Sequence, residues 1–303
     1  MLKHPIFQKL TSDKLALFLL ALPGILHFII FKYIPLGGNV IAFQEYNMFK
    51  GILGSPWVGF KHFAALFTYP EFYQILRNTL LLSLYSLIFG FPAPLLLALL
   101  LNEVRSMWFK RPVQTILYLP HFLSWVIVGG IFINLLSSNG IINDILGKFG
   151  IGPIDFLTKP EYFRGIVISI SIWKEVGWGT IIYLAALASV NPNLYEAAMV
   201  DGAGRWKQMW YITLPTLMPT IVILFLLRIG NVLESNVEQV LIFQNPLNRE
   251  VAEVIDTYVY RAGLLGARFS YTTAIGIFQA VIGLLLIVSL NQLSKRTTGE
   301  SIY

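Results

Sequence analysis

Long apolar runs separated by shorter polar stretches dominate the chain. A membrane core about 30 Å thick requires roughly 20 apolar residues in helical form, and a helix satisfies its own backbone hydrogen bonds where water is absent. Runs of that length occupy residues 15–34, 77–101, 113–136, 164–188, 213–233 and 271–292. The pattern therefore predicts an all-α, polytopic membrane protein with six transmembrane helices.

Two of the predicted spans carry charged residues well inside their ends. Lys174 and Glu175 lie within the fourth span, and Arg228 lies within the fifth. An ionisable side chain inside a span is costly and usually faces a cavity or a partner. These two spans are therefore the first places to look for a functional site.

Composition supports the membrane assignment and excludes several other classes. Hydrophobic residues make up 56% of the chain and charged residues 13%, whereas soluble domains carry about 25% charged residues. The net charge of +6 comes from basic residues that flank the apolar runs rather than forming a basic stripe, so we expect no nucleic-acid partner. The chain has no cysteine, and its four histidines lack metal-ligand spacing, so we expect neither disulfides nor a metal site.

The distribution of basic residues predicts the orientation, because Lys and Arg are retained on the cytoplasmic side. With both termini inside, the inner segments hold Lys3, Lys9, Lys14, Arg105, Lys110, Arg111, Arg205, Lys207, Lys295 and Arg296. The outer segments, which are longer in total, hold Lys50, Lys61, Lys148, Lys159, Arg249, Arg261 and Arg268. We therefore predict cytoplasmic termini. The first apolar run is expected to be a retained anchor, since no small-residue cleavage site follows it.

This orientation divides the chain into four parts. They are a cytoplasmic N-terminus with the first transmembrane helix (1–34), an extracytoplasmic connection (35–76), a membrane core (77–292) that contains a cytoplasmic loop (191–215), and a cytoplasmic tail (293–303). The outer segments 35–75 and 137–163 are rich in aromatic residues and in glycine, respectively. Two interpretations remain open for them: they receive an extracellular partner, or they merely connect helices.

Residues 191–215, between the fourth and fifth spans, carry the most specific pattern. Asn191-Pro192 ends one helix, Tyr195 to Val200 favours a short helix, and Gly202 and Gly204 permit a turn into a second amphipathic stretch. The pattern predicts an exposed elbow outside the membrane.

The elbow resembles the EAA loop of binding-protein-dependent ABC importers. The pattern is E-A-A, three residues, G, nine residues, I-x-L-P, and it is matched by Glu196-Ala197-Ala198, Gly202, Ile212 and Leu214-Pro215. The resemblance implies the type I ABC importer permease fold and a bacterial cell-membrane location. In that family the elbow is the coupling helix held in a cleft of the cytoplasmic ATPase. The implied coupling residues are Glu196, Ala197, Ala198, Asp201, Gly202, Ala203, Gly204 and Arg205.

The likeness extends from about residue 12 to 296. Trp57-Val58-Gly59-Phe60 and Arg77-Asn78-Thr79 look like the approach to the second span in sugar permeases. Asn245-Pro246-Leu247 and the segment from Asp256 to Arg261 resemble the LplB-like subgroup, which handles polysaccharide fragments. The resemblance therefore implies an oligosaccharide or polysaccharide fragment as the substrate.

A first candidate substrate wall lies in the fourth span, where Trp173, Lys174, Glu175 and Trp178 follow one another closely. Indole rings pack against the apolar face of a sugar ring, and a carboxylate accepts hydrogen bonds from its hydroxyls. The alternative is that the tryptophans mark a membrane interface while Lys174-Glu175 pairs with a neighbouring helix.

A second candidate wall follows the fifth span and comprises Asn231, Glu234, Ser235, Asn236, Glu238 and Gln239. Positions 231, 234, 235 and 238 share one face at helical spacing, and in sugar permeases this segment contributes to the mid-membrane pocket. The alternative is a solvated helix end. Arg228 is expected either to neutralise one of these acids or to contact an acidic sugar.

The chain has no G-x-x-x-x-G-K-[ST] phosphate cradle, so it is expected to be neither an ATPase nor another enzyme. The implied partners are a homologous permease subunit, a cytoplasmic ABC ATPase dimer that binds ATP and Mg, an extracytoplasmic solute-binding protein, a saccharide and membrane lipid. Alternatives are a permease for another solute such as glycerol phosphate, an ion-coupled secondary transporter, or a membrane enzyme. A secondary transporter often has two related halves, and the sequence shows no such internal similarity. A membrane enzyme could use paired acids such as Glu234 and Glu238, but no nucleophile or metal constellation accompanies them in the sequence.

Overall fold

The computed structural model describes residues 12–297 and 299. Within this part of the chain the regular elements are helical, and one isolated bridge joins Gln44 and Trp57. Six helices are long and apolar enough to cross a membrane: Leu17–Phe43, Pro70–Glu103, Trp125–Lys148, Pro160–Ala188, Arg205–Gly230 and Phe269–Arg296. The predicted all-α, six-span fold is confirmed. Residues 1–11, 298 and 300–303, which belong to the expected N-terminal part (1–34) and C-terminal tail (293–303), lie outside the described residues.

The elements in chain order are α1 (Ser12–Phe28), η2 (Ile29–Tyr33), α2 (Ile34–Leu36), η3 (Gly37–Phe43), α3 (Gly51–Gly54), α4 (Lys61–Thr68), α5 (Pro70–Tyr85), η4 (Ser86–Gly90), α6 (Pro92–Glu103), α7 (Met107–Tyr118), η5 (Leu119–Phe122), α8 (Trp125–Leu136), α9 (Ile141–Lys148), α10 (Pro160–Ala188), α11 (Pro192–Val200), α12 (Arg205–Gln208), η6 (Met209–Thr213), α13 (Leu214–Gly230), α14 (Val237–Phe243), α15 (Arg249–Ala252), α16 (Ile255–Tyr258), η7 (Val259–Leu265) and α17 (Phe269–Thr297).

The predicted third span, 113–136, is wrong in its bounds because the helix breaks inside it. A 3-10 turn, Leu119–Phe122, ends α7, and Ser124 starts α8 by accepting a hydrogen bond from the Ile127 amide. Pro120 lacks the amide hydrogen that an uninterrupted helix would use. The candidate membrane helix therefore begins at Trp125 rather than at residue 113.

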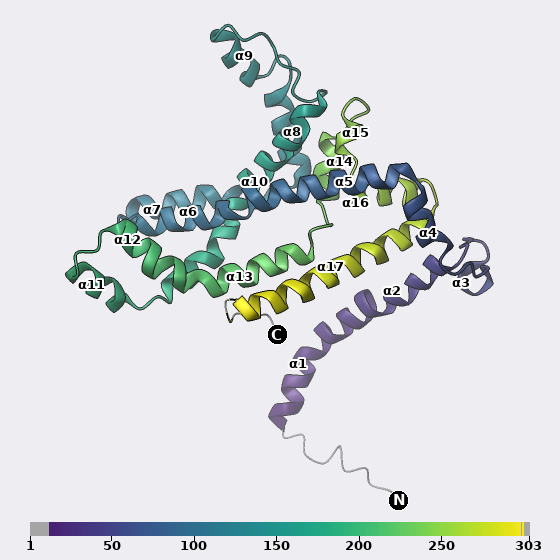
Figure 1. Ribbon diagram of the computed structural model, residues 1–303, viewed down its shortest axis with the longest axis horizontal. Helices are drawn as coiled ribbons and strands as arrows, with labels where there is room; N and C mark the ends of the chain where they lie inside the picture. Colours follow the sequence, from purple (N-terminus) through teal and green to yellow (C-terminus); the bar gives the residue numbers. More distant parts are fainter. Residues whose placement is uncertain (1–11, 298, 300–303) are drawn as a thin grey trace, which may run out of the picture.

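The molecule is elongated, with two well-separated ends (Figure 1). Helices α5, α6, α13 and α17 run along its length, and α11 and α12 lie at the same end as the α6–α7 connection. Arg205 and Glu103 form an ion pair across that end at 3.6 Å. The short helices α3 and α4 lie at the opposite end, whereas α15 lies beside α14, near α5 and α10.

The segments 35–75 and 137–163, predicted to be extracytoplasmic connections, are folded rather than loose, and their ends overlap the candidate membrane helices Leu17–Phe43, Pro70–Glu103 and Trp125–Lys148. The Tyr46 amide donates to Ser270 Oγ at 2.9 Å, and His62 Nε2 lies 3.0 Å from the Gln44 carbonyl oxygen. Asn143 Nδ2 donates to the carbonyl oxygens of Ser137 and Ile154, which closes the segment that carries α9.

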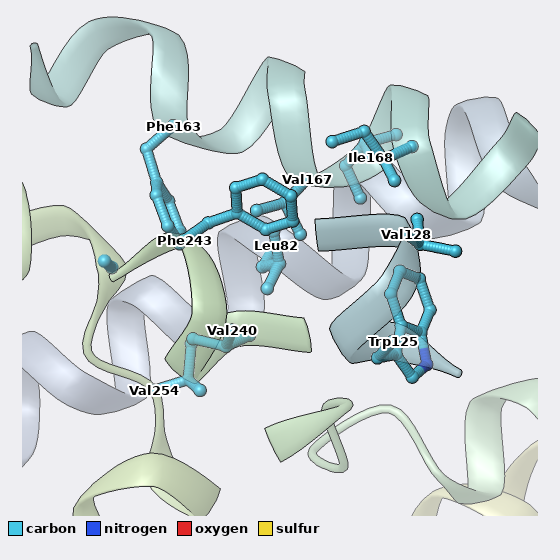
Figure 2. Close-up of a cluster of buried hydrophobic side chains, with 11 residues drawn as sticks. Leu82, Trp125, Val128, Phe163, Val167, Ile168, Val240, Phe243 and Val254 are labelled. Carbon is cyan, nitrogen blue, oxygen red and sulfur yellow. The ribbon is translucent and has the colours of Figure 1, made fainter. Parts of the chain in front are cut away.

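The largest buried cluster lies where α5, α8, α10 and α14 meet, and Figure 2 shows its aromatic and aliphatic side chains converging. It includes Leu82, Trp125, Val167 and Phe243. In a bilayer, close packing of small residues contributes to helix association. A Cβ atom on Gly177 would overlap the Leu117 carbonyl oxygen, and one on Gly179 would press on Pro94. These glycines allow α10 to contact α7 and α6 closely.

Candidate functional site

A cavity of about 550 Å³ opens between α5, α6, α10, α13 and the start of α14. Its wall is mainly apolar, with polar side chains contributed by η4, by α10 and by the chain that links α13 to α14. Such a mixture is typical of small-molecule sites, in which a few polar groups fix the orientation of a ligand.

The segment between α13 and α14 is not helical. The helix α13 ends at Gly230 and α14 begins at Val237, so the predicted helical face through residues 231, 234, 235 and 238 is wrong. Contacts from distant elements stabilise this break: Ser83 Oγ donates to the Val232 carbonyl oxygen, and Gln279 Nε2 donates to the Leu233 carbonyl oxygen at 2.9 Å. Irregular backbone is tolerated beside a membrane span where it is buried in protein or lines a cavity.

Ser235 fixes the middle of this broken segment. Its amide and its hydroxyl donate to Asp256 Oδ2 at 2.6 and 2.9 Å, and Gln279 Nε2 lies 3.2 Å from Asp256 Oδ1. Asn236 Oδ1 then accepts from the Gln239 amide at 2.9 Å and caps α14. The broken segment is thus anchored to α16 and α17.

Five of the six residues predicted in the second wall line the cavity. They are Asn231, Glu234, Ser235, Asn236 and Gln239. Gln239 is buried and bridges to α10, since its Nε2 donates to the Val167 carbonyl oxygen and its Oε1 accepts from Ser171. Glu238 is exposed and lies outside the cavity lining, because α14 begins between it and Glu234 and turns it away.

The first predicted wall divides into two groups. Glu175 and Trp178 line the cavity, whereas Trp173 and Lys174 do not. Trp173 packs edge to face against Phe132. Lys174 is 5% exposed, and its ammonium donates to the His121 carbonyl oxygen at 2.7 Å and lies 3.2 Å from Glu175 Oε1. Lys174 therefore stabilises the wall from behind rather than facing the cavity.

His121 completes this wall. Its Nδ1 lies 2.7 Å from Glu175 Oε2, and its ring stacks on Trp178 with centroids 4.3 Å apart and planes 3° apart. One face of the Trp178 ring is therefore occupied by His121. Glu175 has the Lys174 ammonium beside one carboxylate oxygen and the His121 imidazole beside the other.

Arg228 approaches the cavity from α13. Its Nη2 donates to Ser86 Oγ at 2.5 Å, and both residues line the cavity. Ser86 begins the π-helical turn η4, which interrupts the second span. Single π-helical turns occur frequently at functional sites.

The predicted elbow is present at one end of the molecule. Asn191 Oδ1 accepts from the Asn193 amide at 3.0 Å and caps α11. Gly202 has a φ of +74°, a conformation that favours glycine, and the chain then enters α12 after Gly204. Glu196, Asp201 and Trp206 are exposed, whereas Ala198 and Ala203 are partly buried and joined by a backbone hydrogen bond of 2.8 Å.

Known proteins identify the family of this fold. Residues 90–299 match the family described as binding-protein-dependent transport system inner membrane component. The chain belongs to this family.

Similar proteins cover nearly the whole permease. A Bacillus subtilis (strain 168) protein named polygalacturonan/rhamnogalacturonan transport system permease protein YteP is 54% identical over 296 residues, which is 97% of this chain and 92% of that protein. Protein LplB of the same organism is 48% identical over 95% of this chain and 91% of its own length. A solved bacterial alginate ABC transporter, in complex with alginate pentasaccharide-bound periplasmic protein, matches with 46% identity and a TM-score of 0.88, covering 96% of this chain and 98% of that one.

The Arg77-Asn78-Thr79 motif of this permease has a structural role within α5. Asn78 Nδ2 donates to the carbonyl oxygens of Glu250 and Glu253 at 2.8 and 3.1 Å, and its Oδ1 accepts from Arg164. Thr79 Oγ1 accepts from the Ile255 amide at 2.9 Å. The motif thereby attaches the middle of α5 to α15 and to the chain that leads into α16.

Sequence reasoning missed His121, Asp256 and Ser86 as members or supports of the site. The absence of metal-ligand spacing among the histidines leaves His121 without a predicted role. A usable signal is nevertheless present, because Pro120-His121 is a polar break in an otherwise apolar run. Ser86 gives no comparable signal, since a lone serine is common in membrane helices.

Proposed function

We propose that this permease carries oligosaccharides or polysaccharide fragments into the cell, and that the cavity forms its share of the translocation pathway. The supporting observation is the broken segment 231–236, which lines the cavity with polar groups directly after a membrane span. The YteP relative is named for polygalacturonan/rhamnogalacturonan transport, and the similar solved transporter is one for alginate.

The cavity chemistry suits a carbohydrate. Asn231, Asn236 and Glu234 offer amide and carboxylate groups to hydroxyls. Trp178 is partly exposed, and His121 covers one face of its ring, so the remaining surface is available to pack against a sugar ring. In this proposal Lys174 and Trp173 position the wall without contacting substrate.

The energy for transport is proposed to come from an ABC ATPase dimer docked on the elbow, with ATP and Mg bound by that partner. Exposed apolar side chains on the elbow, including Val200 and Trp206, offer a docking surface. A homologous permease subunit would close the open side of the cavity. An extracytoplasmic solute-binding protein would deliver the saccharide at the end that carries α3 and α4, which makes the elbow end and both termini cytoplasmic.

An ion-coupled secondary transporter needs no ATPase and leaves the elbow without a role. The two mechanisms are separated by reconstituting the permease with its homologous subunit, ATPase and binding protein in liposomes. We expect saccharide accumulation that requires both ATP and binding protein. Accumulation that follows an imposed ion gradient without ATP would support the secondary transporter instead.

A further inference from the structure

Arg228 differs from the other charged groups of the cavity wall. No carboxylate of the described residues lies within ion-pair distance of its guanidinium, and its one side-chain hydrogen bond goes to the neutral Ser86 hydroxyl. The expected alternative in which Arg228 neutralises an acid of its own cavity wall is therefore wrong for the described part of the chain.

Two acidic residues in or behind the cavity wall already have ion-pair or hydrogen-bond partners within the chain. Glu175 is flanked by Lys174 and His121, and Asp256 accepts hydrogen bonds from Ser235 and Gln279. Glu234 is exposed within the lining and lies farther than 4.0 Å from the Arg228 guanidinium, since no ion pair joins them. Over residues 12–297, the wall thus presents one cation without an internal counter-charge.

Ser86 orients this cation. The guanidinium has five N–H donors in a planar fork, and the bond from Nη2 to Ser86 Oγ uses one of them. An uncompensated charge beside apolar surface is unfavourable until an anion approaches it. Because the fork matches the two oxygens of a carboxylate, Arg is better suited to this ligand than Lys is.

We infer that Arg228 binds the carboxylate of an acidic sugar, and that the permease selects oligosaccharides containing uronic acid residues. The inference rests on the proposed function and adds the chemical class of its substrate. In this arrangement Arg228 contacts the carboxylate, while Asn231, Glu234 and Asn236 on the following segment meet hydroxyls. A neutral oligosaccharide offers the guanidinium no counter-charge.

The test compares probes that differ in charge. The complete transporter, with its binding protein, is reconstituted, and initial uptake is measured for trigalacturonic acid, for its methyl ester and for neutral galactotriose. The variants are Arg228→Gln, which removes the charge and the fork, and Arg228→Lys, which keeps the charge alone. Arg268→Gln is the matched control, because Arg268 is exposed, outside the cavity lining and next to the beginning of α17. The amount of assembled complex is measured on each preparation.

In Arg228→Gln we expect the ratio of acid to ester uptake to fall about tenfold or more, the size expected for loss of a charge-assisted hydrogen bond. Arg228→Lys should restore part of the ratio, and Arg268→Gln should keep it. An unchanged ratio in Arg228→Gln, whatever the total uptake, would overturn the inference and indicate a structural role or a pair with the homologous subunit. Preference of the wild type for the neutral probes would overturn it too, leaving saccharide import intact. If none of the three probes were taken up, the proposed import of saccharides would be rejected as well.

Discussion

His121 and Trp178 stack face to face, with ring centroids 4.3 Å apart, although 57 positions separate them in the sequence. The stack joins the α7–α8 connection to α10 and sets the orientation of an indole that lines the cavity. The adjacent bond between His121 Nδ1 and Glu175 orients the carboxylate of the same wall.

Replacing His121 should therefore weaken substrate handling rather than membrane insertion. His121→Ala removes both the stack and the bond to Glu175, and we expect uptake per assembled complex to fall about tenfold. His121→Phe keeps a ring against Trp178 and should retain more activity. Uptake assays on equal amounts of assembled complex give the comparison, and full activity of His121→Ala would contradict a positioning role for this residue.

Gly202 provides a test of the elbow. Its φ of +74° is strained for other residues, and no atom lies within 4 Å of the position that a Cβ would occupy, so a substitution there acts through the backbone alone. Gly202→Val should cost about 1–2 kcal/mol in the local turn and lower substrate-stimulated ATP hydrolysis. Gly202→Asn should be milder, because Asn tolerates this conformation. Equal stimulation in the two variants would argue against a required turn geometry.

The close packing of α10 against α7 at Gly177 leads us to expect a folding defect when this residue is enlarged. A methyl group there would overlap the Leu117 carbonyl oxygen, a backbone atom that moves only with α7. Gly177→Ala should therefore reduce the yield of folded permease, measured by gel filtration in detergent. Gly165→Ala in the same helix meets open space and is the matched control. A normal yield for Gly177→Ala would show that α7 and α10 separate easily.

The proposed orientation can be tested directly because the chain contains no cysteine. Trp206 on the elbow and Leu247 between α14 and α15 are both exposed, and the predicted topology places them on opposite sides of the membrane. A membrane-impermeant maleimide added to intact spheroplasts should label Leu247→Cys and leave Trp206→Cys unlabelled until the cells are opened. The opposite labelling pattern would invert the topology.

The spans and the elbow could be predicted from the sequence because both depend on local patterns. A run of about 20 apolar residues specifies a membrane helix wherever it occurs, and Asn191 and Gly202 act on backbone groups within a few positions of themselves. The break in the third span was missed, although Pro120 marks it.

The geometry of the cavity could not be predicted in the same way. Helical spacing predicted that Glu234 and Glu238 share one face. The backbone between Asn231 and Asn236 is instead non-helical, because it is hydrogen-bonded to Ser83, Asp256 and Gln279 from three other parts of the chain. Similarly, the residue pattern around Lys174 does not reveal that its ammonium turns toward the His121 carbonyl oxygen. Contacts between distant segments decide which polar residues face the cavity.

Glu234 and Glu238 now form a matched pair for testing the second wall. Both carboxylates are exposed, but Glu234 lines the cavity and Glu238 does not. Since a hydrogen bond to a charged group contributes about 1.5–3 kcal/mol, Glu234→Gln should lower uptake about tenfold or more if its carboxylate accepts from a sugar hydroxyl. Glu238→Gln should leave uptake near the wild-type level. Both variants remove one negative charge, so a general electrostatic effect would change them equally. Initial uptake rates over a range of substrate concentrations distinguish these cases, and a greater loss in Glu238→Gln would place the substrate against a different face of α14.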